Sequence, residues 1–198
     1  MRTFIAVDLS KEIRGKLKEL QHQFMHLDVD QSRLKLKFVN PWQAHQTLKF
    51  MGEVPEDKIE AIKGELSVIK QEPFEIALSG VGYFPKASPE KVRNIRVVWV
   101  GITKGVEELK ALQDDVESRL STLGFPMEKR FSAHVTICRV KTFSHAGSRG
   151  EIVRMVEEIR ELKDVELGEM QVEELKLKRS TLTPKGAIYD DMYVKKLE

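Results

Sequence analysis

Two short segments of the chain combine histidine and threonine in the same order. Residues 45–48 read His-Gln-Thr-Leu and residues 134–137 read His-Val-Thr-Ile, so each has His-x-Thr followed by an apolar residue. In a chain of this composition the His-x-Thr pattern is expected by chance roughly 0.2 times, which makes two copies improbable without a shared role. These segments are the first candidates for chemistry.

Two imidazoles and two hydroxyl groups suit cleavage of a phosphoester without a metal ion. An imidazole, with its usual pKa of about 6.5, is either a neutral base or a charged acid near neutral pH. One of His45 and His134 can therefore take a proton from the attacking oxygen while the other gives a proton to the leaving oxygen. Thr47 and Thr136 can donate hydrogen bonds to phosphoryl oxygens. On this argument the two histidines are interchangeable.

Two other interpretations of the histidines are open. Each can be an ordinary sheet residue hydrogen-bonded to its threonine, which is the commoner role for a single copy but a poor account of a matched pair. A catalytic zinc site is the second interpretation, but two histidines without a nearby Asp, Glu or Cys provide too few of the three protein ligands that it needs. We therefore expect no metal and no cofactor.

Strands must hold the motifs if each histidine is to point with its threonine. Side chains alternate between the two faces of a strand, so His45 and Thr47 share one face of a strand over residues 45–51. Leu48 and Phe50 then turn the other way, toward a core. The second motif lies in an equivalent predicted strand and follows the same rule.

The same alternation adds three secondary candidates for contact with phosphate. Arg130 and Ser132 lie four and two residues before His134, and Lys49 lies four residues after His45. If the strands extend that far, these side chains share the face of the histidines. A guanidinium group can bind two phosphate oxygens at once, so Arg130 is the strongest of the three.

Apolar periodicity predicts the elements around the motifs. Ser10 is the predicted N-cap of the first helix, and Gly124 is the predicted C-terminal stop of the third. We expect helices from Ser10 through Phe24 and over residues 55–70, 104–123 and 151–162. We expect strands over residues 3–9, 34–39, 45–51, 74–84, 92–102, 131–140, 172–179 and 188–197.

The order of these elements favours an α+β fold. Strands 74–84 and 92–102 are predicted to form a hairpin, and strands 172–179 and 188–197 flank a second turn that also contains Pro-Lys. The residues up to 102 and the residues from 104 onward each contain the order helix, strand, helix, strand, turn, strand. This suggests an internal duplication. We expect one bilobal domain over residues 1–198, in which two pseudo-symmetric antiparallel sheets face a central cleft and helices pack outside.

The paired motifs resemble those of the two-histidine phosphoesterase superfamily, specifically the RNA 2′,3′-cyclic phosphodiesterases that are also called 2′-5′ RNA ligases. The resemblance covers nearly the whole chain. Ala133 stands where proline is common before the second histidine, and Cys138 stands where alanine is common; neither change removes a catalytic group. The matching segments are residues 2–7, 45–54, 131–139 and 180–189.

The resemblance implies hydrolysis of RNA 2′,3′-cyclic phosphate ends to 2′-phosphomonoesters. It implies that His45 donates a proton to the leaving 3′-oxygen, that His134 accepts one from water, and that both threonines hold phosphate oxygens. RNA ends, tRNA fragments or nucleotides are the implied partners. Two alternatives use the same cleft: a ligase that runs the reaction backward with a 5′-hydroxyl RNA end, and a non-catalytic module that binds RNA ends.

Further residues are candidates for holding RNA. Trp42, Tyr83 and Phe84 can stack on a nucleobase, although packing against the core or rim is the commoner role. His145 lies in a predicted loop, where a surface position without function is the simpler interpretation. Basic residues that alternate along strands can form a floor for the RNA backbone, although a solvated face explains them equally well. They are Lys35, Lys37, Lys49, Lys176, Lys178 and Arg179.

Composition limits the classes of protein to which the chain can belong. A chain of 198 residues, 41% of them hydrophobic, can bury a core without disulfides or a structural metal. Its only cysteine, Cys138, excludes a disulfide framework, and a net charge of +2 alone does not indicate nucleic acid. Charged residues interrupt the apolar start too early for a signal peptide, and no apolar run approaches the ~20 residues of a membrane span. We expect a soluble, monomeric, cytoplasmic protein that does not bind membranes.

Overall fold

The computed structural model describes residues 1–198 except 31, 89–90, 129, 144–147 and 185. The predicted loop position of His145 therefore lies outside the described residues, and the two predicted Pro-Lys turns are described only in part. Among the described helices, none is both long enough and apolar enough to cross a lipid bilayer.

Strands and helices alternate along the described chain. The strands are β1 (Arg2–Asp8), β2 (Leu34–Phe38), β3 (His45–Glu53), β4 (Phe74–Phe84), β5 (Val97–Lys104), β6 (His134–Thr142), β7 (Glu166–Val172), β8 (Glu174–Thr183) and β9 (Gly186–Lys196). The α-helices are α1 (Lys11–Met25), α2 (Ile59–Ser67), α3 (Val106–Thr122) and α4 (Arg149–Glu161). Two 3-10 turns, η1 (Pro41–Gln43) and η2 (Glu56–Lys58), precede β3 and α2.

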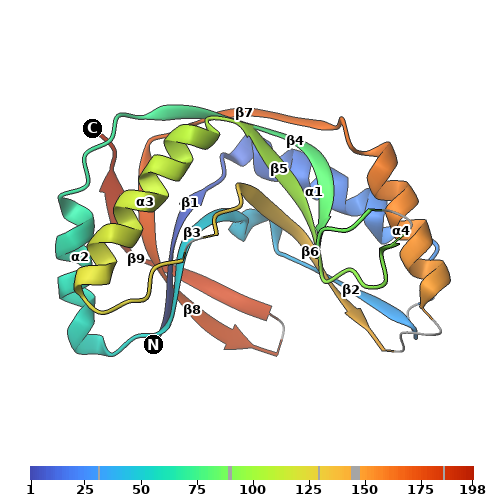
Figure 1. Ribbon diagram of the computed structural model, residues 1–198, viewed down its shortest axis with the longest axis horizontal. Helices are drawn as coiled ribbons and strands as arrows, with labels where there is room; N and C mark the ends of the chain where they lie inside the picture. Colours follow the sequence, from blue (N-terminus) through green and yellow to red (C-terminus); the bar gives the residue numbers. More distant parts are fainter. Residues whose placement is uncertain (31, 89–90, 129, 144–147, 185) are drawn as a thin grey trace.

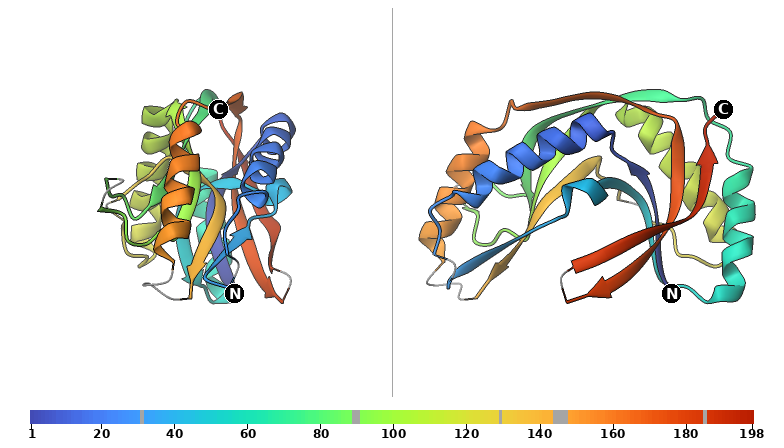
Figure 2. Two further views of the ribbon diagram at one scale, coloured as in Figure 1. Left: turned by 90° about the vertical axis from the view of Figure 1, so that its right-hand side faces the viewer. Right: turned by 180° about the vertical axis from the view of Figure 1, so that it is seen from behind.

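The strands form two antiparallel sheets. Sheet A has the order β3-β1-β8-β9, and sheet B has the order β2-β6-β5-β4-β7. In Figure 1 the sheets make an arch with α2 and α3 along one outer flank and α4 along the other, and Figure 2 shows α1 from behind. Helices α2 and α3 contact sheet A, whereas α1 and α4 contact sheet B. The predicted α+β fold, with two antiparallel sheets and outer helices, is confirmed.

A three-strand unit of the same order occurs in both sheets. The units are β3-β1-β8 and β6-β5-β4, and the first strand of each carries a His-x-Thr motif. When the chain is divided between β4 and β5, the third strand of each unit comes from the other part, because β8 pairs with β1 and β4 pairs with β5. Each sheet is therefore built from both halves, and neither lobe corresponds to one half of the sequence.

Two helix ends carry the capping residues that the sequence predicts. The Ser10 hydroxyl accepts a hydrogen bond from the amide of Ile13 at 3.2 Å, which caps the start of α1. Gly124 follows α3 with a φ of +86°, a left-handed conformation that glycine adopts without strain. The apolar stripe that α1 buries consists of Ile13, Leu17, Leu20 and Phe24.

Some predicted strand limits are wrong. Strand β5 begins at Val97 rather than Val92, because the apolar residues before it, including the fully buried Ile95, pack against the core from outside a strand. Strand β6 begins at His134 rather than at residue 131. Strand β7 is not predicted by the sequence, because it is an edge strand with several exposed polar side chains and Gly168 at a φ of +107°.

A β-bulge interrupts β3 directly after its histidine–threonine pair. Thr47 and Lys49 pair with consecutive residues of β1, which leaves Leu48 as an extra residue. The alternation shifts by one, so Lys49 turns to the core side and is 2% exposed, whereas Phe50 turns outward and is 45% exposed. The predictions that Lys49 shares the face of His45 and that Phe50 faces the core are therefore wrong.

The same bulge occurs in β6. Thr136 and Cys138 pair with consecutive residues of β5, which leaves Ile137 as the extra residue. Cys138 therefore turns away from the motif face into the core, where burial raises the pKa of its thiol to about 12. Arg139 takes the exposed position on the face of His134.

A buried ion pair attaches β3 to α3 at the first bulge. Lys49 Nζ lies 2.6 Å from Glu117 Oε2, and both side chains are nearly inaccessible to solvent. The carbonyl of Pro126 accepts a second hydrogen bond from Lys49 at 2.8 Å, and the amide of Glu128 donates to Glu117 at 3.1 Å. Each charged group therefore has one further hydrogen bond that partly offsets its removal from water, while Glu117 Oε1 is buried without a partner among the described residues.

Removing one partner of this pair is expected to cost more than removing both. Lys49→Met or Glu117→Leu leaves a buried unpaired charge and should lower the free energy of unfolding by about 3–5 kcal/mol. The double variant leaves no unpaired charge, so its cost should fall well below the sum of the single costs. Urea denaturation of the wild type and the three variants measures this cycle, and additive costs would contradict the assignment.

Candidate active site

Both motif histidines stand at the first position of their strands and are held in the same way. His45 Nδ1 lies 2.8 Å from the carbonyl oxygen of Gln43, and His134 Nδ1 lies 2.9 Å from that of Ser132. A carbonyl oxygen can only accept, so Nδ1 carries the proton in each ring. In the neutral ring Nε2 then keeps its lone pair, and Nε2 is the atom that each imidazole offers for proton transfer.

Gln46, the middle residue of the first motif, links the two motifs. Its side chain is 1% exposed, and its Oε1 accepts a hydrogen bond from the amide of His134 at 2.6 Å. Its Nε2 donates to the carbonyl of Thr47 at 2.7 Å and to that of Ser132 at 3.4 Å. Strands β3 and β6 also contact each other. The starts of the two motif strands therefore lie side by side, as the acid–base hypothesis requires.

Aromatic rings pack against His45. The ring of Phe4 lies 4.8 Å from the imidazole of His45, centroid to centroid, and that of Tyr189 lies 5.2 Å away, edge to face. Phe4 comes from β1, beside β3, and Tyr189 comes from β9. These contacts restrict rotation of the imidazole and exclude water from it.

Aromatic rings surround His134 in a similar way. Phe84 lies 5.1 Å from its imidazole, edge to face, and Trp99 lies 6.3 Å away. The indole of Trp99 covers Gly82 on the neighbouring strand, where a Cβ atom would lie only 2.4 Å from the indole ring. Glycine at position 82 is therefore needed for Trp99 to lie flat beside the site.

The environment lowers the pKa of both imidazoles. Burial is the main cause for each, because it disfavours the charged ring. For His45 the hydrogen bond to Gln43 and the carboxylate of Asp8 oppose this effect, while nearby cations add to it. For His134 the bond to Ser132 opposes it, and Arg139 lowers the pKa further. Both rings are therefore predominantly neutral at pH 7.

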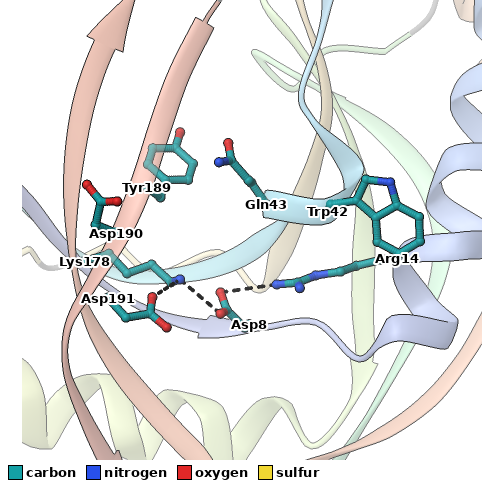
Figure 3. Close-up of a pocket in the computed structure, with 8 residues that line it drawn as sticks. All are labelled: Asp8, Arg14, Trp42, Gln43, Lys178, Tyr189, Asp190 and Asp191. Carbon is teal, nitrogen blue, oxygen red and sulfur yellow. Dashed lines mark hydrogen bonds and ion pairs between the residues drawn. The ribbon is translucent and has the colours of Figure 1, made fainter.

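A cavity of about 450 Å³ lies beside the first motif, and Figure 3 draws the side chains that line it. Gln43 and Tyr189, which contact His45, belong to its wall. Inside it, Lys178 Nζ lies 3.0 Å from Asp8 and 2.5 Å from Asp191. The cavity is lined by Asp8, Arg14, Trp42, Gln43, Lys178, Tyr189, Asp190 and Asp191. Its charges are thus largely paired with one another.

The sequence-predicted site residues divide into two groups. His45 with Thr47, and His134 with Thr136, are half-buried on the same face of their strands, as the alternation predicts. Arg130 and Ser132 lie in the exposed segment before β6, so strand alternation does not place their side chains. Ser132 contacts His134 through its backbone carbonyl rather than its side chain. A role for Arg130 stays a prediction.

Several neighbours of the imidazoles were not identified from sequence. Gln46 occupies the x position of the His-x-Thr pattern, where the second motif has Val135, so the pattern assigns this residue no role. Phe4 and Trp99 lie in apolar runs that indicate only a buried strand. Of the predicted stacking residues, Phe84 packs against His134 and Trp42 lines the cavity, whereas the hydroxyl of Tyr83 donates to the carbonyl of Ala87 at 2.7 Å.

Metal-ligating side chains do not cluster in the part of the chain that the structure describes: no group of three or more His, Cys, Asp or Glu there is placed to hold an ion.

Comparison with known proteins places this fold and site in a family. The chain matches the family described as LigT like Phosphoesterase over residues 7–93 and 100–189. These two ranges include both motifs and most of the chain. The chain belongs to the LigT-like phosphoesterases.

Curated relatives and solved structures agree with this placement. A protein of Archaeoglobus fulgidus is 39% identical over 98% of this chain and 99% of its own length, and one of Methanothermobacter thermautotrophicus is 38% identical over 100% and 99%. Both are named RNA 2′,3′-cyclic phosphodiesterase. The crystal structure of TT0787 of Thermus thermophilus superimposes with a TM-score of 0.75 at 29% identity, covering 100% of this chain and 98% of that one.

Replacing Gln46 tests the link between the motifs. Gln46→Leu leaves the buried amide of His134 without an acceptor, so the free energy of unfolding should fall by about 1–3 kcal/mol. The amide resonance of His134 should also move upfield in a ¹H–¹⁵N spectrum as its hydrogen bond is lost. Gln171→Leu, at an exposed strand position far along the chain, is the control. An unchanged His134 amide resonance in Gln46→Leu would rule out the bridge.

Proposed function

We propose that this protein hydrolyses 2′,3′-cyclic phosphate ends of RNA to 2′-phosphomonoesters, with His45 and His134 as its acid and base. The observation that carries the proposal is the matched orientation of two imidazoles, each bound through Nδ1 to a carbonyl and each offering Nε2, on strands joined by Gln46. The names of full-length relatives at 38–39% identity support the substrate class.

The proposed reaction balances with these groups alone. Nε2 of His134 takes a proton from water as the water oxygen bonds to phosphorus. The bond from phosphorus to the 3′-oxygen breaks, and protonated His45 gives its Nε2 proton to that oxygen. Thr47 and Thr136 donate hydrogen bonds to the non-bridging oxygens, where negative charge accumulates. The products are a 2′-phosphomonoester and a 3′-hydroxyl group.

Different neighbours support different roles for the two histidines. The carboxylate of Asp8 favours the charged form of His45, as a proton donor requires, although Lys178 and Arg14 oppose it. Arg139 favours the neutral form of His134, as a proton acceptor requires. These charges support the assignment of His45 as the acid and His134 as the base.

Product analysis tests the function. Incubation of an oligonucleotide bearing a 2′,3′-cyclic phosphate with the protein in chelator should yield a 2′-phosphate end. His45→Ala and His134→Ala should each lower kcat by roughly 10²–10⁴-fold without a change in thermal unfolding. His22→Ala, at an exposed position on α1, is the matched control. A longer strand as product would indicate a ligase instead, and intact substrate with measurable binding would indicate a non-catalytic module.

The pH dependence of kcat/KM should follow the lowered pKa values. The base must be neutral and the acid protonated, so the profile is a bell whose maximum lies midway between the two pKa values of the free protein. Because burial lowers both, the maximum should lie below about pH 6.5, the usual imidazole value. Hydrolysis rates at low substrate concentration across pH 4–9 measure it. A maximum above neutral pH, or a flat profile, would contradict the assignment.

Three further expectations remain predictions that accompany this proposal. They are the use of tRNA fragments or nucleotides as substrates, a monomeric state and a cytoplasmic location.

A further inference from the structure

Most of the basic residues expected to form a floor for RNA are already neutralised. Lys49 pairs with Glu117, and Arg179 pairs with Asp190 at 3.0 Å. Lys176 and Lys178 also lie on sheet A beside the cavity. Each forms ion pairs with both Asp8 and Asp191. These cations serve the fold of sheet A and have little charge left for a polyanion.

A second group of basic residues lies on sheet B and has no such partners. In the register of β2 and β6, Lys35 lies opposite Lys141, and Lys37 lies opposite Arg139. All four side chains are exposed. Among the described residues none of the four forms an ion pair, and Lys141 Nζ lies 5.1 Å from the ring centre of Phe143. We call Lys35, Lys37, Arg139 and Lys141 the β2–β6 ladder.

The ladder works against the stability of the sheet. Like charges directly opposite each other on antiparallel strands repel, whereas opposite charges at such positions attract. Two cation pairs in succession therefore cost stability that one lysine-to-glutamate exchange in each pair would recover. Such an arrangement is favourable when a polyanion lies across it and neutralises both strands together.

The ladder shares its face with the second motif. The bulge at Ile137 brings Arg139 to the side of His134 and Thr136, and Lys141 follows two residues later on that side. Leu34, which is buried, faces the other way with the rest of the apolar side of β2. At about 3.3 Å per residue, the ladder extends roughly 20 Å from His134 along β6. Figure 1 shows β2 and β6 running together to one end of the arch.

We propose that the β2–β6 ladder binds phosphates of single-stranded RNA upstream of the terminal cyclic phosphate, so that oligonucleotides are the preferred substrates over nucleoside cyclic phosphates. The proposal rests on the proposed function, because it assigns the strand that leads into that site. Phe143, 52% exposed at the far end, offers an aromatic face on which a base can stack. Contacts to phosphate carry no base specificity, so the preference is for length and not for sequence.

The test compares two substrates in two matched variants. Lys35→Ser with Lys37→Ser removes two charges from the ladder, and Lys11→Ser with Lys18→Ser removes two exposed charges from α1, which packs on the other face of sheet B. Arg139 is left intact because it influences His134. The ladder variant should lower the ratio of kcat/KM for an oligonucleotide to that for a nucleoside 2′,3′-cyclic phosphate on the order of tenfold at low salt. The α1 variant should leave the ratio unchanged.

Direct binding separates this proposal from the proposed function. The affinity for an oligonucleotide that ends in a 2′-phosphate needs no turnover, and its dependence on salt counts phosphate contacts. Loss of two contacts should reduce the slope of log K against log salt by about 1.4. Lys141→Ser serves as a second variant, with an expected reduction of about 0.7, and thermal unfolding of each variant should not fall.

The outcomes are distinct. A wild-type protein that binds this RNA but hydrolyses no cyclic phosphate would refute the proposed function and leave the ladder supported if its variants lose affinity. Ladder variants with the wild-type affinity, salt slope and substrate ratio would overturn the ladder, whatever the catalytic result. Equal losses in the α1 variant would also overturn it, because the effect would then come from net charge alone.

Discussion

The site depends on one side-chain amide that joins two sheets. Gln46 on the edge strand of sheet A accepts the amide hydrogen of His134 in sheet B, and its donor group reaches the carbonyl of Ser132, two residues before that histidine. A buried amide with its hydrogen bonds formed is rigid, because leaving any of them unmade carries a desolvation cost. The relative position of the two imidazoles therefore follows from a contact that involves neither ring.

Similar strands produce unlike sites in the two lobes. Both motif strands carry a histidine bound to a carbonyl, a threonine two residues on and a bulge immediately after, yet their surroundings differ. His45 borders a cavity whose basic and acidic side chains neutralise one another, whereas His134 opens onto cations along β6 that form no ion pair with a described residue. An RNA substrate has a matching asymmetry, because it has one reacting end and one long charged strand.

The motif pairs, the fold class and most helices follow from the sequence, because each is encoded in a local pattern. Strand alternation places His45 with Thr47 correctly but fails at Lys49, since a bulge adds one residue and reverses Lys49 and Phe50, which follow it. Nothing in the local sequence marks that bulge. The role of Gln46 and the rings around each imidazole depend on pairing between distant segments, and a single sequence carries no signal for such contacts.

The exchange of β4 and β8 between the sheets has a consequence for how the chain is made. During synthesis β1 and β3 have no third strand until residues 174–183 emerge, so the edge of β1 stays open until then. Closing that edge joins Thr3 to Arg179, which lie far apart in the sequence, and such distant pairings form slowly. Sheet A therefore reaches its full strand order only after β8 has been made, and a chain truncated before residue 174 lacks that partner of β1.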